Sequence, residues 1–228
     1  DPSQANSTYT QTSSRTDFYS VSGYLAANKT FAQKHKLNLT LGAQYEFKEY
    51  TYFGVMVKDI QNGMEIVNGS GDVTLTGDEK KYQNANLSYF GRFNYDYDGR
   101  YLLELNGRYD GSSKFGQNNK YAFFPSVGLG WMISNEDFLK DNEYVNFLKL
   151  KTSAGILGYD RSTEHLLYER AWSQDGSFRF GTTNNGATAY YSTFVRAGNP
   201  NLKWEKAAEW NIGVEGLFLN NRLYTEIN

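Results

Sequence analysis

Residues 37–47 alternate without a break between two kinds of side chain. Every second position from Leu37 to Phe47 is apolar, whereas the positions between them are polar, charged or glycine. A period of two is expected for a β-strand with one apolar face, and it excludes an amphipathic helix, whose apolar positions recur every three or four residues. About eleven residues also match the length of a tilted strand that crosses a bilayer. The stretch therefore predicts a membrane-spanning β-strand.

The same alternation recurs along the chain and predicts about eight antiparallel strands in an all-β fold. Five further stretches show it clearly, and two at the ends of the sequence are weaker candidates. The clear stretches are residues 87–97, 101–109, 121–133, 148–156 and 210–218, and the weaker ones are residues 15–31 and 223–228.

The connections between these strands alternate strictly between short and long. The short ones are residues 32–36, 98–99, 134–146 and 220–221, and the long ones are residues 48–83, 110–120 and 158–203. Asp98–Gly99 predicts a two-residue hairpin turn, because both residue types tolerate positive φ, and residues 137–144 predict a helical turn. Outer-membrane barrels have short periplasmic turns and long external loops. The pattern therefore predicts an antiparallel transmembrane β-barrel.

Alternation also assigns the two faces of each predicted strand. The apolar positions are expected to contact lipid, and the polar positions are expected to line the interior. The first group includes Leu39, Leu41, Tyr89, Phe93, Leu103, Leu105, Leu129 and Ile212. The second group includes Thr40, Gln44, Arg92, Asn94, Asn106, Arg108 and Asn211.

Composition excludes several other classes of protein. No apolar run approaches the roughly 18 residues that a transmembrane helix needs. A net charge of −2 makes a nucleic-acid partner unexpected, and the absence of cysteine excludes a disulfide scaffold. The mean hydropathy of −0.64 does not exclude a membrane barrel, because the strands of such a barrel are apolar on one face only.

No set of residues predicts catalysis, a metal site or a cofactor. His35 and His165 are far apart in the sequence and are expected to be surface residues. The acidic residues Asp110, Asp137 and Asp141 lack the spacing of a calcium-binding loop and are expected to be solvated. We therefore expect a protein that is not an enzyme.

Three parts of the sequence resemble the SusC/RagA family of TonB-dependent transporters. Residues 88–116 read SYFGRFNYDYDGRYLLELNGRYDGSSKFG, and residues 119–139 read NKYAFFPSVGLGWMISNEDFL, followed by LKLKTSAGILG at 148–158. Residues 198–205 read GNPNLKWE, followed by EWNIGVEGLFLNNRL at 209–223. These motifs occur in the family's order and cover most of residues 82–223, whereas residues 1–81 show only generic barrel strands.

The resemblance implies part of a barrel of about 22 strands in the outer membrane of a Gram-negative bacterium. Residues 1–228 are then expected to be an incomplete TonB-dependent receptor barrel, with the plug domain and the remaining strands not represented. The implied function is TonB-dependent import of a large nutrient, a glycan fragment or an oligopeptide. The implied partners are a SusD-like surface lipoprotein, TonB acting through the plug, and membrane lipid.

Two groups of residues are candidates for contact with solute. The connection 158–203 carries aromatic side chains that could stack on sugar rings or peptide side chains. Alternatively, these side chains could pack on one another or on the SusD-like lipoprotein. These are Trp172, Phe178, Phe180, Tyr190, Tyr191 and Phe194. Arg92 and Arg108 could pair with Glu104 and Asp96, or contact the plug or the solute. Trp131, Trp204 and Trp210 are expected in the aromatic girdles at the membrane interfaces.

Two other architectures are compatible with parts of this pattern. A self-contained barrel of eight strands would have a structural or adhesive role. A soluble glycan-binding sandwich would have strands of about five or six residues, which are shorter than those predicted here.

Overall fold

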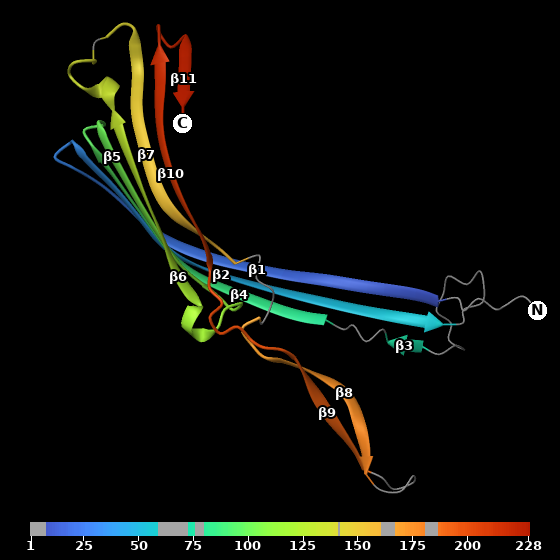
Figure 1. Ribbon diagram of the computed structural model, residues 1–228. Coiled ribbons are helices and arrows are strands. Elements are labelled where there is room, and N and C mark those ends of the chain that lie inside the picture. The colour runs from blue at the N-terminus through green and yellow to red at the C-terminus, as the bar shows by residue number, and fades with distance from the viewer. Residues whose placement is uncertain (1–7, 59–72, 76–79, 141, 161–166, 181–186) are drawn as a thin grey trace, which may run out of the picture. The chain divides into compact units, whose positions relative to one another are not determined.

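The computed structural model describes residues 8–58, 73–75, 80–140, 142–160, 167–180 and 187–228. These residues form antiparallel strands and two short 3₁₀ helices (Figure 1). The strands of the main sheet are β1 (Thr8–Phe31), β2 (His35–Lys58), β4 (Lys80–Tyr97), β5 (Tyr101–Ser112), β6 (Tyr121–Met132), β7 (Val145–Tyr159), β10 (Glu205–Phe218) and β11 (Leu223–Ile227). The other elements are β3 (Val73–Leu75), β8 (Ala171–Phe180), β9 (Ala187–Arg196), η1 (Gln117–Asn119) and η2 (Ile133–Asn135).

The strands of the main sheet follow one another in chain order, β1-β2-β4-β5-β6-β7-β10-β11. The short strand β3 pairs with β2, and β8 and β9 form a separate two-stranded hairpin. Each predicted strand coincides with one of these elements, except for a single residue at the end of the strands predicted at 121–133 and 223–228, so the prediction of an antiparallel sheet of about eight strands is confirmed. No helix in the described part of the chain is long and apolar enough to cross a membrane.

Two predicted long connections are wrong in extent. Residues 48–83 were expected to be a loop, but β2 continues to Lys58 and β4 begins at Lys80. Residues 158–203 contain the β8–β9 hairpin. The sequence did not predict these strand extensions or the hairpin, because the period-two pattern fades there. Aromatic and β-branched residues occur on both faces, and they favour strand pairing without alternation.

The chain divides into two compact units, and strands β1, β2 and β4 pass through both. The first comprises residues 1–20 and 46–85, and the second comprises residues 21–45 and 86–228. In the first unit, Glu49 accepts a hydrogen bond from Gln83 at 2.5 Å and lies 3.2 Å from the Lys81 ammonium. The ring of Tyr50 stacks on that of Tyr82. The account below concerns the second unit.

The register of the second unit keeps polar and apolar residues on opposite faces of the sheet. Side chains paired across neighbouring strands form rows, and each row lies on one face. Two apolar rows are Phe93–Leu105–Val127–Ala154–Trp210 and Tyr95–Leu103–Leu129–Thr152–Ile212. Two polar rows are Arg92–Asn106–Ser126–Gly155–Glu209 and Asn94–Glu104–Gly128–Ser153–Asn211. The predicted assignment of residues to two faces therefore agrees with the register.

The sheet is a single layer with almost no hydrophobic core. Among the described residues, only Phe115 and Phe124 are buried hydrophobic side chains, at 2% and 7% exposure. Large apolar side chains such as Leu41, Leu129 and Ile212 are more than half exposed. Such a large exposed apolar face requires lipid or another partner to cover it.

Candidate functional site

Arg92 and Asn106 face each other across β4 and β5 on the polar face. The Arg92 Nε donates to Asn106 Oδ1 at 2.9 Å. Asn106 Nδ2 in turn donates to Glu104 Oε1 at 2.7 Å and to Ser126 Oγ at 3.2 Å. The amide of Asn106 therefore links three neighbouring strands and holds the Arg92 side chain in position.

Arg108 has different partners from those the sequence suggested. Its guanidinium forms an ion pair with Asp110 at 2.9 Å and lies 6.0 Å from the centre of the Phe90 ring. Its Nη2 donates to Gln44 on β2 at 3.4 Å. Neither arginine pairs with Glu104 or Asp96 among the described residues: Glu104 accepts a hydrogen bond from Asn106 Nδ2, and Asp96 lies 3.5 Å from Lys36.

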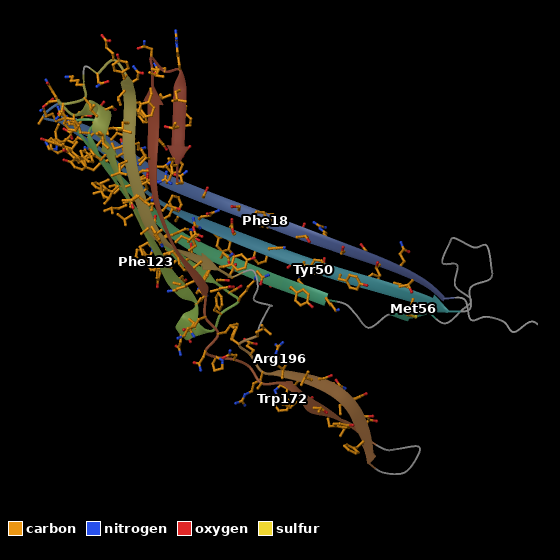
Figure 2. All side chains as sticks on the ribbon, turned by 45° about the horizontal axis from the view of Figure 1, so that its top comes forward. Phe18, Tyr50, Met56, Phe123, Trp172 and Arg196 are labelled. Atoms are coloured by element: carbon orange, nitrogen blue, oxygen red, sulfur yellow. The ribbon has the colours of Figure 1, made fainter. Side chains whose placement is uncertain are left out.

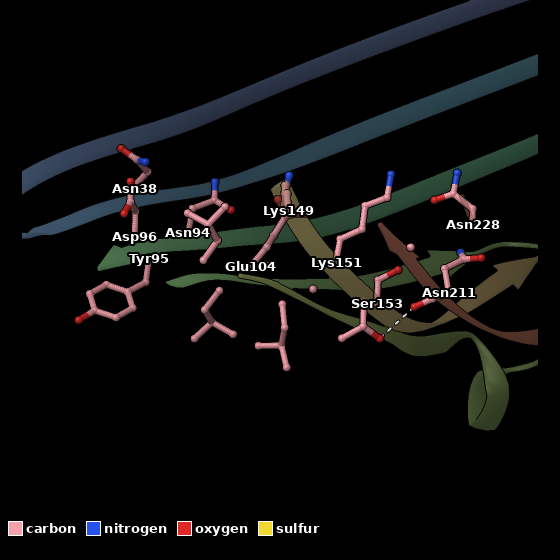
Figure 3. A pocket seen from close by; sticks show the side chains of 17 residues that line it. Asn38, Asn94, Tyr95, Asp96, Glu104, Lys149, Lys151, Ser153, Asn211 and Asn228 are labelled. Carbon is pink, nitrogen blue, oxygen red and sulfur yellow. Dashed lines mark hydrogen bonds between the residues drawn. The ribbon is translucent and has the colours of Figure 1, made fainter. Parts of the chain in front are cut away.

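Two hollows lie on the polar face of the described residues, one toward each end of the strands. The hollow nearer the short turns is about 750 Å³ and includes Asn94, Glu104, Lys149 and Lys151 in its lining. In Figure 3, Asn94, Lys149 and Lys151 point to one side of the sheet, whereas Tyr95 points to the other. The second hollow is about 670 Å³ and lies farther from those turns.

Two arginines and two phenylalanines line the second hollow, which contains three of the four residues predicted to face the interior. Arg92, Asn106 and Arg108 line it together with Phe90 and Phe124. Asn94 lines only the first hollow. The four predicted residues therefore share one face but divide between two hollows.

Lys151 joins the last three strands of the sheet on the polar face. Its ammonium lies 2.5 Å from Glu215 on β10 and 2.7 Å from Glu226 on β11. Two carboxylates thus contact one ammonium, and the short strand β11 is held to β7 across β10.

Aromatic side chains mark both ends of the apolar face. Tyr97, Tyr101 and Trp131 form one row near the short turns, and Tyr89, Tyr109 and Phe123 form another near the long connections. These rows follow the pairings across β4, β5 and β6.

The separation of the two rows is comparable to the thickness of a membrane. Tyr101 and Tyr109 are eight residues apart on β5 (109 − 101 = 8), or about 26 Å along the strand at about 3.3 Å per residue, which is about 20 Å of membrane thickness for a strand tilted by about 40°. The apolar band of outer-membrane barrels is about 25 Å tall, with aromatic girdles at both borders. Trp131 lies in the first row, whereas Trp210 lies between the rows, beside Ala154.

Trp204 was also expected in a girdle, but it belongs to a small core near the second hollow. Its ring lies 5.0 Å from that of Phe115 and 5.4 Å from that of Phe124. A Cβ added at Gly158 would collide with the Phe124 ring, so only glycine leaves room for it. The motifs YDGSSKFG and NPNLKWE thus meet in space, which their spacing in the sequence did not reveal.

A polar contact closes the same region. The fully buried Ser112 donates to Asp160 Oδ2 at 2.9 Å, and Lys114 Nζ donates to the backbone oxygen of Asp160 at 2.9 Å. The backbone amide of Asn199 donates to Leu167 O at 2.9 Å. This last bond joins the two chain segments that lead into and out of the β8–β9 hairpin.

The β8–β9 hairpin carries most of the predicted ligand-contact aromatics, but on two opposite faces. Trp172, which is labelled in Figure 2, packs edge-on against Phe194, its paired residue, at 5.3 Å. Phe178 packs against Tyr191 at 5.0 Å. A register shift between Gln174 and Gly176 turns the second pair to the other face. These four rings and that of Tyr190 are all more than 40% exposed, and the Phe180 side chain lies outside the described residues.

The short turns form a hydrogen-bonded belt at the opposite end of the strands. Asp98 N donates to Lys34 O at 2.7 Å, Met132 N to Arg100 O at 2.7 Å, and Leu219 N to Tyr144 O at 2.9 Å. These three bonds connect four successive turns. Asp98 and Gly99 both have positive φ, 55° and 66°, as the predicted type I′ turn requires.

Glu136 is the centre of the polar contacts at this end. Its carboxylate accepts hydrogen bonds from Trp131 Nε1 at 2.9 Å, Tyr101 OH at 2.7 Å and Arg100 Nη1 at 3.1 Å. The hydrogen bonds from Trp131 and Tyr101, with the nearby Arg100 charge, hold the pKa of Glu136 below its usual value. The sequence predicted a helical turn at residues 137–144. The observed turn is shorter: Lys140 N donates to Glu136 O, and the 3₁₀ helix η2 precedes this turn.

The sequence did not single out Glu136, because its three partners come from two strands and a turn. His35 shares one hydrogen bond with Tyr95 OH at 2.7 Å. The other candidate histidine, His165, and Asp141 lie outside the described residues. Within the described residues, no group of three or more potential metal-ligating side chains is found.

Known proteins share both the sequence and the fold. The family model for the TonB dependent receptor-like β-barrel matches residues 1–228. TonB-dependent receptor SusC of Bacteroides thetaiotaomicron is 38% identical over 145 residues, covering 62% of this chain and 14% of SusC. A TonB-dependent receptor of Formosa agariphila is 40% identical over 158 residues, covering 68% of this chain and 15% of the relative.

A solved structure of the RagAB peptide transporter superposes with a TM-score of 0.81 at 27% identity, covering 95% of this chain and 23% of that one. This chain thus spans about a seventh of the length of those two curated relatives. The resemblance to SusC and RagA is confirmed, and the family is one of outer-membrane transport proteins rather than enzymes. The chain belongs to the TonB-dependent receptor β-barrel family.

Proposed function

We propose that this chain forms part of the barrel wall of a TonB-dependent importer in the outer membrane of a Gram-negative bacterium. The observation that carries the proposal is the register of the second unit, in which the polar rows that contain Arg92 and Asn94 lie on one face and the apolar rows that contain Phe93 and Tyr95 lie on the other. A barrel that encloses a wet path through lipid needs this division. Family membership supplies the coupling to TonB.

In this proposal the apolar face contacts lipid and the polar face lines the interior. Arg92, Asn94, Asn106 and Arg108 then face the path of the solute or the plug. The belt of short turns lies on the periplasmic side, and the long connections lie outside the cell.

The exposed aromatic side chains of the β8–β9 hairpin are proposed to contact the nutrient or a SusD-like surface lipoprotein. Their exposure supports this, because both ring pairs leave one side open. Two faces allow two contacts, one with the nutrient and one with the lipoprotein. Aromatic rings stack on sugar rings or on peptide side chains.

The nutrient is proposed to be an oligopeptide or a glycan fragment too large for a passive porin. The relative of known structure is a peptide transporter by name, which favours a peptide. TonB, energised by the inner-membrane proton gradient, would act through the plug domain.

Deleting the genes for TonB and for the lipoprotein separately tests the proposal. Each deletion is expected to abolish growth on the cognate nutrient and uptake of the labelled nutrient, whereas growth on a small sugar that enters through porins should be unchanged. If uptake survives the loss of TonB, the protein is a passive channel or a structural barrel, and the proposal fails.

The hairpin contact is tested by hydrogen exchange on the full-length protein. Amides of β8 and β9 are expected to exchange more slowly when the purified lipoprotein is present, whereas amides of residues 98–100 in a short turn should not change. Equal exchange of the hairpin with and without the lipoprotein would remove this part of the proposal.

A further inference from the structure

The guanidinium of Arg92 has no acidic partner among the residues that the structure describes. Its one hydrogen bond there goes from Nε to the neutral amide of Asn106. The neighbouring Arg108 differs, because Asp110 neutralises it at 2.9 Å. The charged side chains lining the second hollow are Arg92, Arg108 and Asp110, which sum to one positive charge (2 − 1 = 1).

The first hollow provides an internal comparison on the same face. Its charged lining residues are Asp96, Glu104, Lys149 and Lys151, which sum to zero (2 − 2 = 0). Lys151 is also bound by two glutamates. The summed charge of the lining side chains is therefore positive in the second hollow and zero in the first.

The Arg92 side chain is held so that its terminal nitrogens stay available. Asn106 uses its carbonyl oxygen to accept from Nε and its amide group to donate to Glu104 and Ser126. The two terminal NH₂ groups of the guanidinium then have no hydrogen-bond partner among the described residues, and the side chain is exposed. Two parallel N–H groups match the two oxygens of a carboxylate.

An apolar wall lies beside this charge. A Cβ added at Gly42 would collide with the Phe90 ring, so the ring lies across β2 as well as β4. Leu157, which is 57% exposed, lines the hollow from the β7 side. A ligand that fits this hollow would therefore carry a negatively charged oxygen group beside an apolar part.

We propose that the second hollow is a subsite for a carboxylate of the imported nutrient, with Arg92 as the binding group, Asn106 as its positioning residue and Phe90 as the apolar flank. The inference rests on the proposed function, because it requires the polar face to line the solute path. A carboxylate occurs both in peptides and in uronic acid sugars, so the chemistry is shared by the two nutrient classes.

Binding to the full-length transporter with its lipoprotein, purified in detergent, tests the subsite with two pairs of probes. The first pair is one peptide with a free C-terminal carboxylate and with a C-terminal amide. The second pair is an oligosaccharide with glucuronic acid and its neutral glucose counterpart. The wild type is expected to bind the carboxylate member of one pair at least about tenfold more tightly, because a hydrogen bond to a charged group contributes that much. The pair that shows the preference identifies the nutrient class.

Arg92→Gln is expected to remove this preference while leaving the affinity for the neutral member within about twofold, which also shows that the variant is folded. The matched control is Arg222→Gln, which removes the same charge in the turn before β11, away from the hollow. The control should keep the wild-type preference.

A carboxylate preference that survives Arg92→Gln would overturn the subsite, and so would a wild type without preference in either pair. If one of these results is found but uptake depends on TonB, the subsite is wrong and the proposed function is still supported. If uptake does not depend on TonB, the proposed function falls whatever Arg92 does.

Discussion

The two ends of the strands in the second unit are ordered by different interactions. At the short-turn end, backbone hydrogen bonds connect four successive turns, and the exposed side chains add a polar network around Glu136. At the other end, the connections are long, and order comes from the packing of Phe115, Phe124 and Trp204. This is the one place in the described residues where hydrophobic side chains are buried.

The difference follows from loop length. A turn of two or three residues keeps neighbouring strands in register and brings backbone groups within bonding distance. The connection between β7 and β10, residues 160–204, is far longer and has a larger closure entropy, which side-chain packing must offset. The end with the long connections is therefore also the end that depends on a hydrophobic core.

Replacing Phe124 by alanine tests whether the end with the long connections depends on its hydrophobic core. The variant is expected to lose about 3–5 kcal/mol of unfolding free energy, because a buried ring is removed and a cavity remains. Phe138→Ala is the matched control at the short-turn end, where the ring is 70% exposed, and it should cost less than about 1 kcal/mol.

The measurement is urea unfolding of the full-length protein in lipid, together with protease cleavage in residues 167–203. Cleavage should become faster only in the Phe124 variant. Equal costs at both positions would mean that the outer end has no core of its own.

A charge placed between the two ends tests whether the membrane lies there. Leu105→Arg on the apolar face is expected to cost about 2–4 kcal/mol near the bilayer midplane. Asn94→Arg on the polar face should be nearly neutral, because it lies opposite Glu104. Unfolding in lipid vesicles measures both, and equal tolerance would show that the faces are assigned the wrong way round.

Acid should weaken the short-turn end through Glu136. Its pKa is lowered in the folded protein, so the stability it contributes is complete above the unfolded value of about 4.3. That contribution is lost as the pH falls through the lower folded pKa. Between about pH 6 and pH 3, the wild-type melting temperature should therefore fall more than that of Glu136→Gln. Parallel pH profiles for the two proteins would rule out this role of the carboxylate.

The sequence predicts best what depends on neighbouring residues. The period-two pattern placed Leu105 and Asn106 on opposite faces, and Asp98–Gly99 predicted its own turn, because both signals are local. The contact of Phe115 with Trp204 was not predictable, since it joins residues 89 positions apart (204 − 115 = 89). The division of Trp172 and Phe178 between two faces depends on a register shift that alternation alone does not show.

Chemical labelling of single cysteines on intact cells tests most directly whether the two ends face opposite sides of the outer membrane. Asn118→Cys in η1 and Ser192→Cys in β9 are at exposed positions near the long connections, and Lys140→Cys is at an exposed position near the short turns. A reagent that cannot cross the membrane should label the first two on intact cells and Lys140→Cys only after the outer membrane is permeabilised. Labelling of Lys140→Cys on intact cells, with Asn118→Cys and Ser192→Cys protected, would contradict the account.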